Sequence, residues 1–370
     1  MSRIYLYETV FPDYRAGLFQ GLKDRYQTEI TLACGDVSFS ATLKTYNNAD
    51  AIRTQLGNTY WLGRRLLWQT GLFPTALDAE LVIAEFSVRA PSTWLLLVRR
   101  YWAGKPTILW GHALGSRWIS RLVRWWMFKY CDGFIAYMPR EAAKLRAAFP
   151  NLTVWVAPNS FMHEADCHGL KKPSAEVIDV IYVGRLVGHK KVSLLLDGFL
   201  HAVKRGGLPA QTRLLLVGDG PERGLLSSKA KDLGMAERVV FYGHVSDVGA
   251  LRKLYATALV SVSPGCVGLA ATQSFGFGVP ILVADNEPHG PEVELCRVNE
   301  NAAFFAANEA ESLATKLTSL FSERDAWLSR RETISSEMRA NYTFEKMLEA
   351  FSTVIEAVNI KSKRTGKNIL

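Results

Sequence analysis

Short apolar runs alternate with longer amphipathic stretches along the whole chain. Apolar runs bounded by polar residues or glycine are typical of buried strands, whereas apolar positions that recur every three or four residues are typical of helices. The alternation predicts an α/β fold in which helices cover parallel strands. The expected strands are 3–7, 29–33, 81–84, 107–110, 133–136, 154–157, 177–183, 213–217, 239–242, 259–262 and 281–284.

The second half of the chain carries the clearer helix signals. Ser193 is expected to cap a helix that runs to about Lys204 and stops at Gly206. Pro221 is expected to open the next helix and Gly234 to close it. Proline suits the first helical position, and glycine suits the residue after the last one.

The length of 370 residues is enough for two domains with separate cores. Residues 159–176 have mixed charge and no periodicity, and they are interpreted as a linker between domains at 1–158 and 177–341. A helix at 342–360 is expected to pack on the first domain. The basic end, 361–370, is expected to be a frayed and solvated tail.

The stretch 255–284 contains no charged residue and is long enough to cross a membrane. It contains Pro264 and Pro280 and divides into strand, loop, helix and strand, so buried α/β core is the preferred interpretation. The N-terminal apolar run is short and is broken by Glu8, which predicts a first strand rather than a signal peptide. Five cysteines without a C-x-x-C pair favour reduced thiols in a cytoplasmic protein.

The net charge of +9 attracts anions, and nucleic acid, anionic lipid and phosphorylated small molecules are all candidates. No helix-turn-helix, zinc-finger or RNP pattern accompanies the charge, so no nucleic acid is expected as a partner. His163, Asp166, Cys167 and His168 carry metal-binding side chains, but a linker rarely supplies the convergent geometry of a metal site. No metal is therefore expected.

Residues that suit a phosphate follow the expected strand 177–183. Gly184 allows a sharp turn, Arg185 then stands at the carboxyl end of the sheet, and Lys190 precedes the next helix. An arginine fork and a lysine point charge together suit a diphosphate. Two solvated loop charges are the alternative.

A second loop, 263–269, joins a strand to the expected helix 270–277. Gly265 and Gly268 allow close approach of the backbone to a phosphate, and N–H groups at a helix start bind anions without any side chain. A tight turn that binds nothing is the alternative here.

These segments stand in a recognisable order with several others. The order is Val183-Gly-Arg-Leu186 with Lys190, Leu216-Val-Gly-Asp-Gly-Pro-Glu222, Phe241-Tyr-Gly-His244, Leu254-Tyr255, the Gly268-Leu269 loop and Phe275-Gly-x-Gly-x-Pro280. Over 177–320 the set resembles the C-terminal domain of the retaining GT-B glycosyltransferases of family 4, or group 1. Segments 11–19 and 109–112 resemble parts of some members less closely.

The resemblance implies the GT-B fold, in which two doubly wound Rossmann-like domains face each other across a cleft. It also implies a nucleotide-diphosphate sugar in the C-terminal domain, an acceptor in the N-terminal domain, and a leaving phosphate that accepts the acceptor's proton. It implies no metal, and the chain has no Asp-x-Asp motif. No cofactor is expected besides this donor, whose base is left open.

The resemblance assigns roles to individual residues. Those expected to act in catalysis are Arg185, Lys190 and His112; those expected to bind the donor are Gly184, Gly265, Gly268, Leu269, Gln273, His244 and Glu292; and those expected to bind the acceptor are Arg15, Glu85 and Arg89. Solvated loop charges are the alternative for the acceptor set, and a structural hydrogen bond is the alternative for His112.

One departure from the family pattern concerns the donor sugar. The family usually has two glutamates eight positions apart around the glycine loop, and this chain has Gly265 and Gln273 there. Gln273 still offers a neutral amide to the ribose hydroxyls. Glu292 or Glu294 is the expected substitute for the missing carboxylate at 265.

Cations are interleaved with tryptophans in the first domain. The segments concerned are 61–68, 94–102 and 117–129. In the last of them Arg117, Arg121 and Arg124 share one helical face. Interfacial helices favour this mixture, so contact with an anionic membrane surface is expected, with core packing and solvated arginines as the alternative.

The combined expectation is a metal-independent, retaining hexosyltransferase that lies on the cytoplasmic face of a membrane. It would transfer a hexose-type sugar to a lipid-linked or saccharide acceptor during synthesis of a surface polysaccharide, lipopolysaccharide or glycolipid. A degenerate GT-B fold that acts as a membrane-associated binding partner is the alternative, because both expected glutamates are absent.

Overall fold

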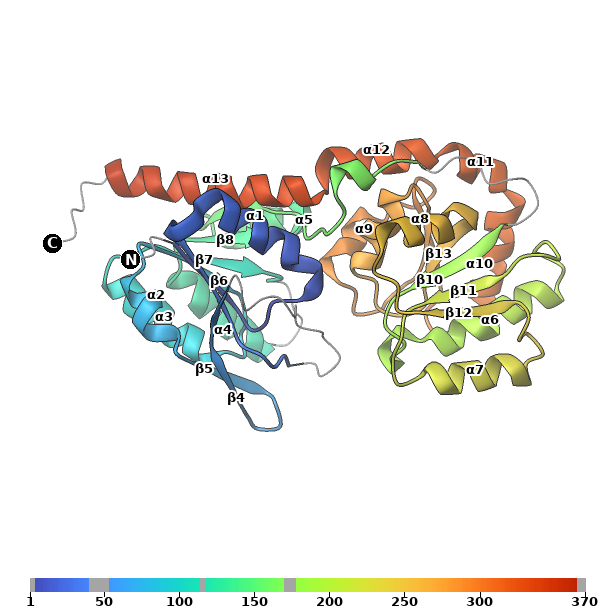
Figure 1. Ribbon diagram of the computed structural model, residues 1–370, viewed down its shortest axis with the longest axis horizontal. Helices are drawn as coiled ribbons and strands as arrows, with labels where there is room; N and C mark the ends of the chain where they lie inside the picture. Colours follow the sequence, from blue (N-terminus) through green and yellow to red (C-terminus); the bar gives the residue numbers. More distant parts are fainter. Residues whose placement is uncertain (1–3, 40–52, 114–117, 170–177, 365–370) are drawn as a thin grey trace. The chain divides into compact units, whose positions relative to one another are not determined.

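A computed structural model describes residues 4–39, 53–113, 118–169 and 178–364 of the chain (Figure 1). The chain forms two compact units. Unit 1 comprises Met1–Phe161 and Phe344–Leu370, and unit 2 comprises Met162–Thr343. Of the expected linker, residues up to 169 are described and include a short 3-10 turn, Glu164–Asp166. The expected tail 361–370 lies partly outside the described residues.

Unit 1 is built on a sheet of seven parallel strands in the order β3-β2-β1-β6-β7-β8-β9. The strands are β1 (Ile4–Glu8), β2 (Ile30–Cys34), β3 (Arg53–Gln55), β6 (Leu81–Glu85), β7 (Thr107–Gly111), β8 (Gly133–Ala136) and β9 (Thr153–Val156). Residues of β1, β7 and β8 are buried throughout, as expected for parallel strands covered on both faces. The chain order reverses between β1 and β6.

Six helices are described in unit 1. They are α1 (Ala16–Tyr26), α2 (Leu72–Asp78), α3 (Pro91–Trp102), α4 (Trp118–Lys129), α5 (Pro139–Ala148) and α13 (Phe344–Arg364). The last of these, α13, runs beside α1 in Figure 1. A Cβ atom at Gly21 would lie 2.9 Å from Leu348, and the ring of Phe351 meets Trp110 edge to face at 4.7 Å. The final helix therefore completes the core of unit 1.

The segment 61–68 has the mixture of residues that interfacial helices favour, but it forms the turn and inner ends of a β-hairpin. Strands β4 (Gly57–Trp61) and β5 (Leu66–Thr70) pair antiparallel across a turn in which Leu62, Gly63 and Arg64 all have positive φ. Alternate residues face opposite sides, so Leu67 is fully buried while Trp61 is half exposed. The short apolar run has strand rather than helix periodicity.

The arginine face expected on α4 is also wrong for Arg124, which is buried. Leu122 and Trp125 are exposed on the same helix. Arg117 lies outside the described residues. On α3, Arg100 is fully buried and donates to the carbonyl oxygens of Ala76, Ala79 and Pro106, so some of the charge in this region is structural.

Unit 2 is built on six parallel strands in the order β12-β11-β10-β13-β14-β15. The strands are β10 (Asp179–Val183), β11 (Leu214–Val217), β12 (Val239–Gly243), β13 (Ala258–Ser263), β14 (Ile281–Ala284) and β15 (Ala302–Phe305). The helices are α6 (Val192–Lys204), α7 (Arg223–Asp232), α8 (Val248–Thr257), α9 (Leu269–Gly276), α10 (Ala310–Ser322), α11 (Arg324–Ser329) and α12 (Arg331–Asn341).

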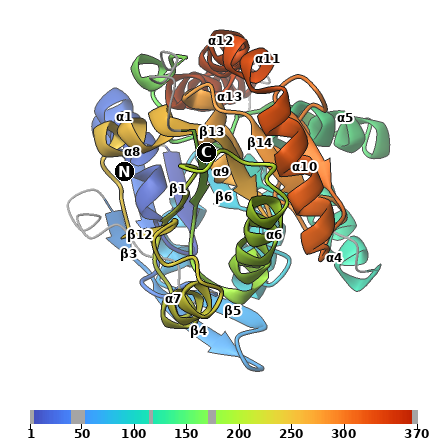
Figure 2. The same ribbon diagram turned by 90° about the vertical axis from the view of Figure 1, so that its right-hand side faces the viewer.

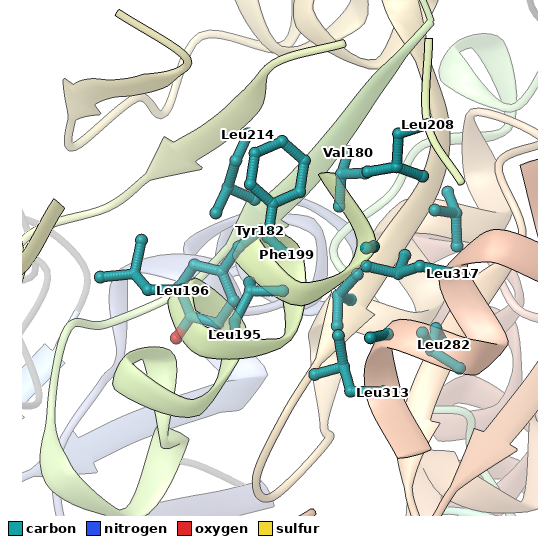
Figure 3. Close-up of a cluster of buried hydrophobic side chains, with 14 of the residues drawn as sticks. Val180, Tyr182, Leu195, Leu196, Phe199, Leu208, Leu214, Leu282, Leu313 and Leu317 are labelled. Carbon is teal, nitrogen blue, oxygen red and sulfur yellow. The ribbon is translucent and has the colours of Figure 1, made fainter. Parts of the chain in front are cut away.

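Helices α6 and α10 lie side by side against this sheet (Figure 2). Their apolar side chains interlock with those of the strands, as Phe199, Leu313 and Leu317 do with Val180 and other residues in Figure 3. The chain order reverses between β10 and β13, so the carboxyl ends of these two strands form the topological switch point of unit 2. Ligands of open α/β sheets bind at such points.

Two helix starts differ from the sequence prediction. Lys191, with φ of 52°, is the N-cap of α6, whereas Ser193 lies inside the helix. Helix α7 begins at Arg223 rather than at Pro221, which lies in the preceding turn. In both places a turn shaped by backbone contacts determines where the helix begins, and the capping preferences of single residues are too weak to decide it.

The charge-free stretch 255–284 forms β13, α9 and β14, and almost all of it is buried in unit 2. The prediction of α/β core is confirmed. Among the described residues, no helix has the length and apolar character needed to span a membrane.

Candidate functional site

The switch point of unit 2 brings together the two loops that the sequence indicates for phosphate. The loop after β10 carries Arg185 and Lys190, and the loop after β13 runs through Gly265 and Gly268 into α9. The Lys190 ammonium group donates a hydrogen bond of 2.6 Å to the carbonyl oxygen of Cys266. Lys190 is thereby fixed at the start of the glycine loop.

The same two loops touch through their backbones. A Cβ atom at Gly265 would clash with the carbonyl oxygen of His189 and would lie 3.0 Å from the carbonyl carbon of Lys190. The Cys266 N–H also donates to the carbonyl oxygen of His189 at 3.4 Å. Glycine at 265 is therefore a steric requirement of this arrangement.

The motif after β11 is part of the same backbone assembly. The Gly184 N–H donates to Val217 O at 2.9 Å, and the Leu186 N–H donates to Asp219 O at 2.9 Å. Gly218 has φ of 143°, and a Cβ atom there would overlap the carbonyl oxygen of Gly184. The glycines of the two motifs therefore let adjacent strand ends pack backbone to backbone.

The electrostatics of this edge are positive. Burial lowers the pKa of Lys190, and the charge of Arg185 lowers it further, while Glu292 acts in the opposite direction. Burial also lowers the pKa of His189, with the charges of Lys190 and Arg185 adding to the effect. The first N–H groups of α9 have no partner within the helix and carry the positive end of its dipole. The set can hold an anion with two phosphate groups.

Two other expected donor residues have different surroundings. Gln273 is buried on α9, where its amide oxygen accepts a hydrogen bond of 3.4 Å from the Tyr255 hydroxyl. His244 is exposed at the end of β12, two strands away from β10. A role for His244 in donor binding therefore stays a prediction.

Sequence reasoning missed His289 as a support of the glycine loop. The Val267 N–H donates to His289 Nδ1 at 3.1 Å, and the Gly290 N–H donates to Val267 O at 2.7 Å. Burial lowers the pKa of His289, which favours the neutral imidazole that this acceptor role requires. The only sequence signal is the position of His289 after β14, beside the strand that carries the loop.

Glu292 lies near the same loop. It is buried, and its carboxylate would be 3.8 Å from a Cβ atom placed on Gly268. It also lies close enough to Lys190 to affect the lysine pKa. The structure therefore brings Glu292, Lys190, Arg185 and Gly268 to one edge of the sheet.

In unit 1 the corresponding switch point lies between β1 and β6. The Thr9 N–H, just after β1, donates to the Glu85 carboxylate at 2.5 Å. Arg15 is buried, where it donates to Glu8 Oε1 at 2.7 Å and to the Tyr137 hydroxyl at 2.5 Å. Burial raises the pKa of Glu8 to about 8, against the opposing effect of Arg15. Arg15 is thus a buried ion-pair partner rather than a solvated loop charge.

The third expected acceptor residue, Arg89, has a different environment. It is exposed, donates to the carbonyl oxygens of Arg64 and Arg65, and lies 3.9 Å above the ring of Phe39. These contacts tie it to the turn of the β4–β5 hairpin. The structure therefore separates its contacts from those of Glu85 and Arg15.

His112 follows β7 at the carboxyl edge of the unit 1 sheet, with 40% of its side chain exposed. Its Nδ1 atom lies 2.9 Å from Oε1 of Glu141, a fully buried carboxylate at the start of α5. Sequence reasoning missed Glu141, because the residues stand far apart in the chain. Among the described residues, no group of three or more His, Cys, Asp or Glu could hold a metal ion.

Comparison with known sequences relates this chain to sugar-transferring enzymes. Residues 171–340 match the family profile of glycosyl transferases group 1. An uncharacterized glycosyltransferase of Methanocaldococcus jannaschii is 27% identical over 138 residues, which is 36% of this chain and 33% of the relative. The Vi polysaccharide biosynthesis protein VipC/TviE of Salmonella typhi is 29% identical over 150 residues, which is 39% of this chain and 25% of the relative.

N-acetyl-alpha-D-glucosaminyl L-malate synthase of Bacillus anthracis is 22% identical over 194 residues, 51% of this chain and 47% of the relative. The matched segments thus span a quarter to about half of the length of these relatives. Among solved structures, HepE of Anabaena in complex with UDP is 17% identical, with a TM-score of 0.70 over 96% of this chain and all of HepE. The lipopolysaccharide outer core galactosyltransferase WaaB has a TM-score of 0.65 at 15% identity, over 96% of this chain and 99% of WaaB. The chain therefore has the GT-B fold, and its residues 171–340 match the family profile of glycosyl transferases group 1.

Proposed function

We propose that this chain is a retaining glycosyltransferase that moves a hexose-type sugar from a nucleotide-diphosphate sugar to a lipid-linked or saccharide acceptor. The observation that carries the proposal is the contact of the Lys190 loop with the glycine loop at the topological switch point of unit 2. The group 1 match covers the same residues. Relatives in polysaccharide and lipopolysaccharide synthesis support a role in building a surface polysaccharide or glycolipid.

In this proposal Arg185 and Lys190 hold the diphosphate together with the N–H groups of Gly268 and Leu269. As the bond between the sugar and the diphosphate breaks, negative charge grows on the leaving oxygen. Preorganised cations and helix-start N–H groups stabilise that charge in the transition state, and they do so without requiring a metal. The leaving phosphate oxygen accepts the proton of the acceptor hydroxyl, which attacks from the face that the phosphate leaves.

The remaining donor contacts follow from the same site. Gln273 bonds the ribose hydroxyls through its amide, and Glu292 accepts a hydrogen bond from a sugar hydroxyl in place of the glutamate that the family has at position 265. In unit 1, Glu85 is assigned to acceptor binding and His112 to catalysis in this proposal. HepE has been solved with UDP and with UDP-glucose, and pneumococcal GtfA with UDP and GlcNAc, so uridine is the first base to expect.

Nucleotide binding tests this proposal directly. UDP is expected to raise the unfolding midpoint of the chain in a thermal scan against UDP, GDP, ADP and dTDP. A ligand at 100 times its dissociation constant adds about 2.7 kcal/mol to the free energy of unfolding, which is readily measured. The Lys190→Met variant should lose most of the shift. If none of the four nucleotides shifts the unfolding midpoint, the proposal is contradicted and the degenerate GT-B fold is favoured. The absence of glutamate at positions 265 and 273, which are Gly265 and Gln273 here, is consistent with that alternative.

We also propose that unit 1 lies on an anionic membrane surface. Exposed apolar side chains gather on the hairpin turn and on α3 and α4: Trp61, Leu62, Trp102, Leu122 and Trp125. Ring contacts join α3 to α4 through Trp94–Trp126 and Tyr101–Tyr130. Arg99 and Lys129 are exposed on the same two helices. Indoles at the boundary with cations toward the headgroups match an interfacial surface.

Vesicle flotation tests the membrane contact. The chain should float with phosphatidylcholine vesicles that contain phosphatidylglycerol, and the double variant Trp102→Ser/Trp125→Ser should bind at least about tenfold more weakly. Leu225→Ser is the matched control, because Leu225 is 74% exposed but lies in unit 2. Equal binding by the control and the double variant, or no flotation of the unaltered chain, would refute the membrane contact.

A further inference from the structure

The two residues before the N-cap of α9 are held through their backbones by other parts of unit 2. Cys266 is bonded to the loop that carries Lys190, through its N–H at 3.4 Å and through its carbonyl oxygen at 2.6 Å. Val267 is bonded to the segment after β14, where its N–H donates to His289 Nδ1 at 3.1 Å and its carbonyl oxygen accepts the Gly290 N–H at 2.7 Å. All four backbone polar groups of this pair therefore have partners outside the glycine loop.

These four bonds determine where the start of α9 lies. Gly268 is the N-cap of the helix and has no side chain that could bond to the first N–H groups. Val267 directly precedes it, and its side chain is fully buried. The first N–H groups of α9 can bind an anion only in the place where Val267 holds them. A group that fixes Val267 therefore acts on the anion site without touching the anion.

One of the four bonds depends on the protonation of its partner. Two of them join backbone groups, and the lysine amine in the third donates whether or not it is charged. The imidazole of His289 accepts the Val267 N–H only while its Nδ1 atom carries no proton. Protonation would direct the new Nδ1–H at another N–H donor, and the bond would be lost. The glycine loop thus has one attachment that acid can remove.

The surroundings of His289 place this change on the acid side of neutrality. Burial lowers the pKa of the ring from its ordinary value of about 6.5. The backbone of Ala284 and the charges of Glu287 and Asp285 oppose that effect, while the charge of Lys190 adds to it. Because the ring is harder to protonate in the bonded loop than in solvent, acid favours the loop without this bond. The charged groups that lie around this segment are Lys190, Asp285, Glu287 and Glu292.

We propose that His289 is a positioning residue that holds the glycine loop ready for the diphosphate, and that protonation of its ring releases the loop and weakens donor binding. The inference rests on the proposed function and adds acid sensitivity to the same site. His289 touches no substrate and acts through Val267. Because burial lowers the pKa of His289, the effect should occur below about pH 6.5 and be absent above it.

Two substitutions at one position separate the acceptor atom from the ring. His289→Leu removes the acceptor and leaves the Val267 N–H unpaired, so it should weaken UDP binding about 10- to 100-fold at about pH 7.5. His289→Asn has an amide oxygen near the place of Nδ1 and should recover most of that affinity. His201→Leu is the matched control, because His201 lies on α6 with its Nδ1 atom 3.0 Å from Glu311 on α10. It should bind UDP as the unaltered chain does.

The pH dependence of UDP binding tests the protonation step. The phosphate of UDP itself titrates near pH 6, so the quantity to compare is the ratio of the dissociation constants of the unaltered chain and His289→Asn, in which this ligand effect cancels. The two should bind equally at about pH 7.5, and the unaltered chain should bind about tenfold more weakly at about pH 5. A ratio that stays constant with pH would overturn the proposal, even if His289→Leu fails to fold.

Hydrogen exchange of the Val267 amide tests the bond without any nucleotide. Exchange should be slow in the unaltered chain and in His289→Asn, and faster in His289→Leu at the same pH and with a similar unfolding midpoint. Equal exchange in the unaltered chain and His289→Leu would refute the positioning role.

The two readings distinguish failure of this inference from failure of the proposed function. If the unaltered chain binds UDP but His289→Leu binds it equally well, only the role of His289 is refuted. If the unaltered chain binds none of the four nucleotides, the proposed function fails together with donor release, and slow exchange at Val267 would then describe a structural contact alone.

Discussion

Replacing Lys190 with methionine is expected to lower kcat for glycosyl transfer by about 10²- to 10³-fold, the usual cost of removing one preorganised charge from a transition state. Lys190 is held by its hydrogen bond to Cys266 O, so its charge is in place before the substrate arrives. Burial lowers the pKa of Lys190, and the charge of Arg185 lowers it further, so the ammonium group lies where an anionic partner is favourable. A diphosphate that gains negative charge in the transition state would be such a partner.

The neighbouring lysine provides the control. Lys191 binds Glu287 and the side chain of Asn308, away from the glycine loop. Lys191→Met should therefore lower the unfolding midpoint slightly and leave kcat within a few-fold of the unaltered chain. Lys190→Arg should recover part of the activity, since it keeps the positive charge but replaces the compact ammonium group with a larger planar guanidinium group. If Lys190→Met retains normal kcat with a nucleotide sugar that the unaltered chain uses, other residues must hold the diphosphate.

Introducing the family's glutamate at position 265 is expected to abolish nucleotide binding rather than improve catalysis. A side chain there must displace the backbone of His189 and Lys190, which approaches to within contact distance of Gly265. Overpacking of this kind typically costs about 1–3 kcal/mol, and here the strain falls on the loop that carries the lysine. The thermal shift with UDP should disappear in Gly265→Glu, and Gly265→Ala should already weaken it.

Gly224→Glu is the matched control for this substitution. Gly224 lies near the start of α7, and a Cβ atom placed there has no heavy atom within 4 Å. It adds the same charge to the same unit without a clash, so UDP binding should be unaffected. Increased turnover in Gly265→Glu would show that the His189–Lys190 backbone moves aside, and it would contradict the steric argument.

The strands were the most predictable part of this protein. Both ends of strands β8 and β14 were predicted to the residue, because short apolar runs flanked by polar residues leave few alternative boundaries. The β4–β5 hairpin was not predicted, because the tryptophans and arginines interleaved at 61–68 indicated an interfacial segment instead. The first residues of α6 (Val192) and α7 (Arg223) were also not predicted, because backbone contacts of the preceding loops determine where these helices begin.

Prediction of the site was limited in a similar way. Motif order located Arg185, Lys190 and the glycine loop, and parallel topology then brings them together. The partners that hold these groups were missed. His289 and Glu141 each contact a segment that is distant in the chain, and no local pattern reports such a contact. Arg15 and Arg89 received the same predicted role from the sequence. In the structure Arg15 forms a buried ion pair with Glu8, whereas Arg89 is exposed and donates to backbone carbonyl oxygens of the hairpin turn.

The return of α13 to unit 1 has a consequence for how this chain is made. During synthesis, residues 1–161 leave the ribosome long before the helix that covers Gly17, Gly21 and Trp110 exists. Unit 2 is continuous and can be completed first, whereas unit 1 must wait for the final helix with part of its core uncovered. Unit 1 is therefore finished last, and shortened chains that stop before Phe344 would expose apolar surface that chaperones and proteases recognise.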